Sequence, residues 1–161
     1  MTGPSVHPLE PGDAPALAAL LRAQRDAYMA HFGPFAFDPP VIVKALREAR
    51  RDRYWRLDLD GRMVGFAMMR GLDQGFARPS FGVFVAEHAK GRGVARAALA
   101  HALDWAAAQG DIAHVMLKVA PENRRAWRLY RTTGFRALHI DEATGQLVMQ
   151  YDLLREPGRP G

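Results

Sequence analysis

A glycine-bearing loop separates a short apolar strand from a long alanine-rich helix, and this arrangement constrains the fold more than any other feature. The loop reads Lys90-Gly91-Arg92-Gly93-Val94-Ala95. We expect the strand at Phe81–Val85 and the helix at Val94–Ala108. Glycines at 91 and 93 allow a tight turn and leave successive main-chain N–H groups uncovered. These groups and the helix N-terminus that follows predict a site for a phosphate or pyrophosphate.

Two common phosphate-binding loops do not fit this segment. A Walker A loop requires a four-residue gap and a Gly-Lys-Ser/Thr ending, which are missing here. A dinucleotide fingerprint requires a third spaced glycine, whereas here Ala95 and Ala97 follow the pair. By itself, the glycine pair is equally typical of an ordinary strand-to-helix turn.

A second strand–loop–helix unit follows about thirty residues later. Its strand is expected at Val115–Val119, and its helix begins after Asn123, a favoured N-cap residue. The helix ends near Gly134, which tolerates the positive φ of a C′ position. Both units have basic loops, so both helix N-termini are predicted to face one anionic ligand.

The two units together resemble the GCN5-related N-acetyltransferase (GNAT) family, whose members bind acetyl-CoA. The family's first motif is matched by Lys90, Gly91, Arg92, Gly93, Val94 and Ala95, with lysine in place of the usual arginine or glutamine. Its second motif is matched by Asn123, Ala126 and Tyr130, followed by Gly134-Phe135. The resemblance is best over Arg53 to Leu153 and looser over the amino-terminal helices.

This resemblance implies an α/β fold: a twisted, mostly antiparallel sheet with helices on both faces and a splay between the strands that end at Val85 and Val119. Strands that part leave main-chain groups to be satisfied by a ligand. In the family, that ligand is the amide-rich pantetheine arm of CoA. The implied cofactor-binding residues are Val83, Phe84 and Val85 for this arm, Lys90, Gly91, Arg92, Gly93, Val94, Ala95 and Arg96 for the pyrophosphate, and Asn123. A fully paired core strand at 83–85 and simple helix capping by Asn123 are the alternatives.

The remaining elements are read from periodicity and turn signals. A short strand lies around Val6, and two amino-terminal helices are expected at 14–29, capped by Asp13, and at 38–50. Asp60-Gly61 predicts a hairpin between strands 54–58 and 63–70. Strands at 136–140 and 147–153 complete the sheet.

Length and composition predict one domain, residues 1–155, with a flexible tail at 156–161. No apolar run is long enough to span a membrane, and residues 1–4 do not resemble a signal peptide, so we expect a cytoplasmic protein with no membrane partner. The chain has no cysteine, and its six histidines lack ligand spacing, so we expect no metal. The sequence leaves monomer and homodimer open.

The net charge of +5 and the isoelectric point of about 10.1 raise the question of nucleic-acid binding. Basic residues gather at Lys90–Arg96 and at Arg124-Arg125-Arg128, where the phosphates of CoA account for them. The cluster Arg47–Arg53 is typical of a solvated helix C-terminus. No DNA- or RNA-binding motif is present, so no nucleic-acid partner is expected.

The resemblance implies an acetyl-CoA-dependent N-acetyltransferase that acts by direct attack in a ternary complex. The acceptor we expect is a primary amine of a small molecule, such as an amino sugar. The alternatives are a non-catalytic, regulatory CoA-binding module and a protein or peptide N-acetyltransferase. Tyr130 is the candidate general acid for the leaving thiolate, and its alternative role is a core tyrosine that packs on Phe135.

The sequence does not identify the general base. The strands at 81–85 and 115–119 carry no carboxylate. Glu87 and Asp73 are the nearest acidic candidates, although a solvated loop and a surface turn explain them equally well. A water relay is the remaining option. The aromatic residues near 28–37 (Tyr28, Phe32, Phe35 and Phe37) are candidates for the acceptor pocket or for simple helix packing.

Overall fold

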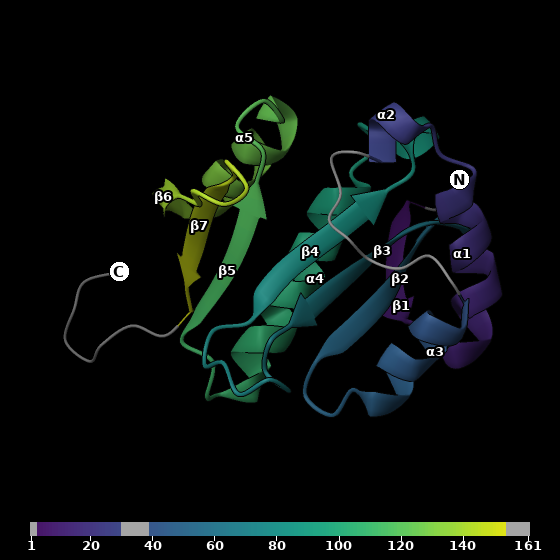
Figure 1. The fold of residues 1–161 in the computed structure, drawn as a ribbon, viewed down its shortest axis with the longest axis horizontal. Helices are drawn as coiled ribbons and strands as arrows, with labels where there is room; N and C mark the ends of the chain where they lie inside the picture. The colour runs from purple at the N-terminus through teal and green to yellow at the C-terminus, as the bar shows by residue number, and fades with distance from the viewer. Residues whose placement is uncertain (1–2, 30–38, 154–161) are drawn as a thin grey trace.

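A seven-stranded sheet crosses the part of the chain that the structure describes (Figure 1). The structure is a computed structural model that describes residues 3–29 and 39–153. In chain order the strands are β1 (Pro4–Pro8), β2 (Arg53–Leu59), β3 (Arg62–Arg70), β4 (Ser80–Val85), β5 (His114–Val119), β6 (Arg136–Ile140) and β7 (Leu147–Asp152). Their spatial order is β1-β2-β3-β4-β5-β7-β6, and every neighbouring pair is antiparallel except β4 and β5. The expected mostly antiparallel sheet is confirmed.

Helices cover both faces of this sheet. They are α1 (Ala14–Arg22), α2 (Asp26–Met29), α3 (Pro39–Glu48), α4 (Val94–Gln109) and α5 (Arg124–Thr133), with 3₁₀ turns η1 (Pro11–Asp13) and η2 (Glu87–Ala89). Side chains alternate between the faces along each strand. Trp55 and Leu57 therefore pack in one core with α4, whereas the neighbouring Tyr54 packs in a second core with Leu17 of α1 and Ile42 of α3. The predicted two-sided arrangement is confirmed.

The hairpin between β2 and β3 turns at Asp60 and Gly61, as predicted. Their φ angles are +52° and +80°. Two successive positive φ angles are the requirement of a type I′ turn, whose twist matches that of the two strands it joins.

The single helix expected over 14–29 is wrong, because it is interrupted between α1 and α2. Gln24 donates from its side chain to the Leu20 carbonyl at 3.0 Å and accepts from the main-chain N–H of Glu87 at 3.2 Å. Arg25 donates to the Glu87 carboxylate at 2.9 Å. The two contacts with Glu87, made across more than sixty residues, hold the chain in a turn and direct Tyr28 of α2 toward β4.

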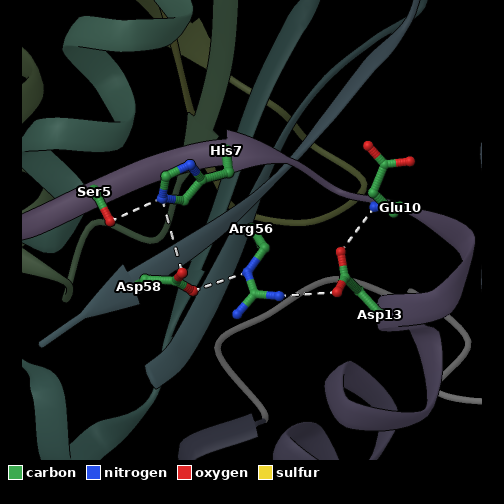
Figure 2. A network of polar contacts seen from close by, with 6 residues as sticks. All are labelled: Ser5, His7, Glu10, Asp13, Arg56 and Asp58. Carbon is green, nitrogen blue, oxygen red and sulfur yellow. Dashed lines mark hydrogen bonds and ion pairs between the residues drawn. The ribbon is translucent and has the colours of Figure 1, made fainter. Parts of the chain in front are cut away.

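Asp13 lies at the N-cap position of α1, but its carboxylate does not cap that helix. It accepts from the main-chain N–H of Glu10 at 2.9 Å and from Arg56 of β2 at 2.8 Å (Figure 2). Arg56 also donates to Asp58 at 2.9 Å. The network therefore connects the start of α1 to β2, the second strand of the sheet.

No helix within residues 3–29 and 39–153 has the length and apolar character needed to cross a membrane. The predicted loop at 32–37 and the predicted tail at 156–161 lie outside the described residues.

Candidate active site

Strands β4 and β5 separate soon after they meet. Their register contains one pair, Ser80 with Met116, beside a hydrogen bond of 2.8 Å from the Met116 N–H to the Pro79 carbonyl. Toward the top of Figure 1 the two strands diverge, with α2 beyond the end of β4 and α5 beyond the end of β5. The structure thus contains the splay that the sequence led us to expect.

The register of β4 decides which main-chain groups face the splay. The N–H of Ala86 donates to the Val64 carbonyl of β3 at 2.7 Å. Hydrogen-bonding direction alternates along an antiparallel ladder, so the main chain of Phe84 also faces β3. The main chains of Val83 and Val85 face the opposite side, toward the splay. Phe84 itself is buried in the core with α1 and α3.

A cleft of about 770 Å³ opens at this splay. It is lined by residues from β4, the glycine loop, α4 and α5. The lining residues are Tyr28, Val83, Val85, Ala89, Lys90, Gly91, Gly93, Val94, Ala95, Arg96, Asn123, Arg124, Arg125, Ala126, Arg128, Leu129, Tyr130 and Thr132. The structure therefore brings most of the predicted site residues together, and it leaves Phe84 and Arg92 outside this lining.

Both loop glycines adopt the left-handed conformation that the tight turn needs. The φ angles are +76° at Gly91 and +83° at Gly93, which is the N-cap of α4. The Gly93 carbonyl accepts the first helical hydrogen bond from Ala97 at 3.0 Å. With this geometry the loop and the first turn of α4 border the cleft without intervening side chains at 91 and 93.

The basic side chains of the loop point in different directions. The ammonium group of Lys90 lies 5.3 Å from the centre of the Tyr28 ring, in a cation–π contact. Arg92 forms an ion pair of 3.6 Å with Asp60 at the β2–β3 turn. Of the three loop cations, Lys90 and Arg96 line the cleft.

Asn123 fulfils the capping role that the sequence suggested. Its side-chain oxygen accepts from the Ala126 N–H at 3.3 Å, which satisfies one of the unpaired donors at the start of α5. The same residue lines the cleft. Capping and ligand contact are compatible, because a carbonyl oxygen has two lone pairs.

Tyr130 lies both in the hydrophobic core and at the cleft. Its ring lies 5.9 Å from that of Phe135, so it is a core tyrosine, and it also lines the cleft. Burial raises the pKa of the Tyr130 phenol to about 12. The group is therefore a protonated hydrogen-bond donor throughout the neutral range.

The two acidic candidates for a general base have structural partners. Glu87 is held by Arg25, whose hydrogen bond lowers the pKa of the Glu87 carboxyl. Asp73 accepts from the main-chain N–H groups of Arg50 at 2.9 Å and Arg51 at 2.8 Å, which lowers the pKa of the Asp73 carboxyl. Neither residue lines the cleft, and no carboxylate belongs to its described lining.

Tyr28, a candidate for the acceptor pocket or for helix packing, lines the cleft, and its contact with β4 was not predicted. Its hydroxyl donates to the main-chain carbonyl of Val85, on the edge of β4 that faces the splay. Burial raises the pKa of the Tyr28 phenol to about 12. The other aromatic residues expected near the acceptor, Phe32, Phe35 and Phe37, lie outside the described residues.

No group of three or more metal-ligating side chains occurs within the described ranges. All charged side chains in the described lining of the cleft are cationic, which suits an anionic ligand rather than a metal ion.

Comparison with known proteins agrees with this geometry. The model of the Acetyltransferase (GNAT) family matches residues 17–135. No curated protein matches the chain. Among solved structures, Mycobacterium smegmatis RimJ in complex with CoA-disulfide is similar at 24% identity, with a TM-score of 0.75 and coverage of 92% of this chain and 81% of that chain.

Two further structures have the same fold. Vibrio cholerae spermidine N-acetyltransferase in complex with CoA and spermine is 21% identical, with a TM-score of 0.74 and coverage of 93% of this chain and 95% of that chain. A GNAT acetyltransferase from Streptococcus pneumoniae is 16% identical, with a TM-score of 0.72 and coverage of 93% and 99%. The family match over most of the chain, together with the splayed sheet, shows that this protein belongs to the GNAT family of acetyltransferases.

Proposed function

We propose that the protein transfers the acetyl group of acetyl-CoA to a primary amine of a small molecule, by direct attack in a ternary complex. The observation that carries the proposal is the convergence, in one cleft, of the splayed edge of β4, the glycine loop and the Tyr130 phenol. We propose that this activity belongs to a single domain formed by residues 1–155.

The described residues fit the parts of CoA. The pantetheine arm is a chain of amides, and the main chains of Val83 and Val85 face the splay where such a chain would lie. The diphosphate requires N–H donors and positive charge, which Gly91–Arg96 and the start of α4 offer. Asn123 and the first turn of α5 border the same space.

The chemistry assigns a donor role to Tyr130. A thioester supplies an activated acetyl group, and its departing sulfur needs a proton or a hydrogen bond. The Tyr130 phenol lines the cleft and stays protonated, so it can provide that hydrogen bond. Because its pKa of about 12 is higher than that of an ordinary thiol, we assign Tyr130 to donating a hydrogen bond that strengthens as charge develops on sulfur.

The acceptor amine must lose a proton before it can attack. No carboxylate belongs to the described lining of the cleft, so we assign this step to water that leads to solvent. Such a mechanism favours acceptors whose amine is already partly neutral near the working pH. The rate should accordingly rise with pH until the acceptor amine is deprotonated.

The charge of the cleft bears on the acceptor class. The cations in its lining are Lys90, Arg96, Arg124, Arg125 and Arg128. A polycation such as spermine, which is bound in the V. cholerae structure, would find no carboxylate among the described lining residues. Since these cations are assigned to the phosphates of CoA, the choice of acceptor rests on the absence of a carboxylate from the described lining, and we favour a small amine with a single positive charge, such as an amino sugar.

A thiol-release assay with acetyl-CoA tests the proposal across amino sugars, amino acids, polyamines and peptides. Turnover of a small monoamine, with polyamines poor, is the expected result. Activity on peptides alone would replace the acceptor assignment with a protein N-acetyltransferase. CoA binding without turnover on any acceptor would instead favour the non-catalytic module, which the absence of a carboxylate from the described lining also fits.

A further inference from the structure

The amino-terminal half of α5 concentrates positive charge on the cleft. Arg124, Arg125 and Arg128 all belong to its lining. None of the three forms an ion pair with a carboxylate within residues 3–29 and 39–153. The first turn of α5 contains no acidic residue. Cations at a helix N-terminus are unfavourable, since the helix dipole is positive there, and an anion at this place would relieve the repulsion.

One of these arginines is in contact with the glycine loop. A Cβ atom built on Gly91 would lie 2.8 Å from Nη1 of Arg125 and 3.7 Å from its Cζ. The Arg125 guanidinium therefore occupies the space that a side chain at position 91 would need. Gly91 has a φ of +76°, which favours glycine, and a side chain at this position would displace the Arg125 guanidinium.

Two basic side chains of the glycine loop contact residues outside the loop. Lys90 is directed to the Tyr28 ring, and Arg92 is paired with Asp60. The cation that lies directly against the backbone of the loop is therefore supplied by α5, some thirty residues further along the chain.

From these contacts we infer that Arg125 binds the diphosphate of CoA and that Gly91, which has no side chain, leaves the space that its guanidinium occupies. The inference rests on the proposed function, because it names the side chain that would hold the nucleotide end of that substrate. A guanidinium can donate two parallel hydrogen bonds to phosphate oxygens, and the contact with Gly91 places that of Arg125 beside the loop. Arg125 is a binding residue in this account and takes no part in proton transfer.

The test compares Arg125→Gln with wild type by calorimetry, using CoA and 3′-dephospho-CoA as ligands. Loss of a charge-assisted pair should weaken the binding of both ligands by about 10- to 100-fold. Arg125→Lys keeps the charge but not the two parallel donors of the guanidinium, so its affinity for both ligands should lie between those of Arg125→Gln and wild type. Arg131→Gln is the matched control, because Arg131 lies on the same helix, 5.1 Å from the Trp127 ring, and does not line the cleft.

A second readout separates ligand contact from a general structural role. S-acetylpantetheine lacks the nucleotide phosphates, so the preference for acetyl-CoA over S-acetylpantetheine, as a ratio of kcat/KM values, should fall by about the same 10- to 100-fold factor in Arg125→Gln. An unchanged ratio would overturn the inference. Weaker binding of CoA but not of 3′-dephospho-CoA would move Arg125 to the 3′-phosphate and also overturn it.

The failure of the inference is distinguishable from that of the proposed function. If Arg125→Gln binds CoA as tightly as wild type, the assignment of Arg125 fails and the proposed function stands. If wild-type protein itself binds no CoA, the proposed function fails and the inference fails with it.

Discussion

The hydroxyl of Tyr28 donates a hydrogen bond to the main-chain carbonyl of Val85, so a side chain of α2 occupies an acceptor on the edge of β4 that faces the splay. The same ring has the Lys90 ammonium 5.3 Å from its centre and packs edge-on against Phe84, with centroids 6.2 Å apart. Tyr28 therefore links α2, β4 and the beginning of the glycine loop at one side of the cleft.

Replacement of Tyr28 by phenylalanine should lower the free energy of unfolding by about 1–2 kcal/mol, because it leaves the Val85 carbonyl without this donor. Urea denaturation measures the change. Tyr28→Leu should cost more, since it also removes the ring that contacts Lys90 and Phe84. Equal stability of Tyr28→Phe and wild type would show that the hydrogen bond contributes nothing.

Tyr130→Phe should reduce kcat by about 10²-fold or more while CoA affinity changes little, because it removes the donor hydroxyl and keeps the ring on Phe135. Steady-state kinetics and calorimetry measure the two quantities. Phe135→Leu is the matched control, since it disturbs the same packing and retains the hydroxyl. A kcat that survives in Tyr130→Phe would remove Tyr130 from the mechanism.

Gly91→Ala should weaken CoA binding by more than Gly61→Ala does, because a methyl group at 91 would displace the end of the Arg125 side chain from the loop, whereas the two substitutions should destabilise the fold by similar amounts. Both glycines have nearly the same φ, +76° and +80°, so the strain of a left-handed alanine, about 1 kcal/mol, is common to both. At Gly61 nothing lies within 4 Å of a new Cβ, whereas at Gly91 it meets Arg125 at 2.8 Å. CoA titration of the two variants gives the comparison, thermal unfolding checks that both keep their fold, and indistinguishable CoA affinities would contradict the Arg125 contact.

Asp73→Asn should destabilise the protein and leave kcat largely unchanged, because the Asp73 carboxylate accepts from the N–H groups of Arg50, Arg51 and Asp52. The pKa of Asp73 is lowered in the folded state, first by the hydrogen bond from Arg51. The stabilisation from the Asp73 carboxylate is therefore complete above the pKa of the unfolded state, about 4. It is lost as the pH falls through the lower pKa of the folded state.

Stability curves of wild type and Asp73→Asn, measured from pH 7 to pH 2, check this sign. The difference in unfolding free energy between wild type and Asp73→Asn should be constant above about pH 4 and should shrink in more acidic solution. A large fall in kcat with unchanged stability would make Asp73 a catalytic base after all.

The features that the sequence predicted correctly depend on near neighbours. Asp60 and Gly61 form their turn from their own φ angles, and Asn123 caps a helix three residues away. In such cases residue type and short-range geometry are sufficient. The paired motifs at Lys90 and Asn123 then carried the resemblance to the GNAT family, and that resemblance implied the fold.

The features that escaped prediction depend on residues far apart in the chain. The interruption after α1 is held by Gln24 and Arg25 against Glu87, and Arg125 finds its place on Gly91. No periodicity or local propensity specifies such pairs, because they form only when the sheet brings distant segments together. The diversion of Arg92 to Asp60 is of the same kind.

A titration of the isotopically labelled protein with CoA, followed by the shifts of its backbone amide resonances, tests the central claim most directly. The account predicts that the largest shifts fall on Gly91–Arg96, with further shifts at Val83 and Val85. Large shifts confined to a different surface, such as the groove between η1 and α3 lined by Pro11, Pro15 and Val43, or no shifts at all, would contradict it.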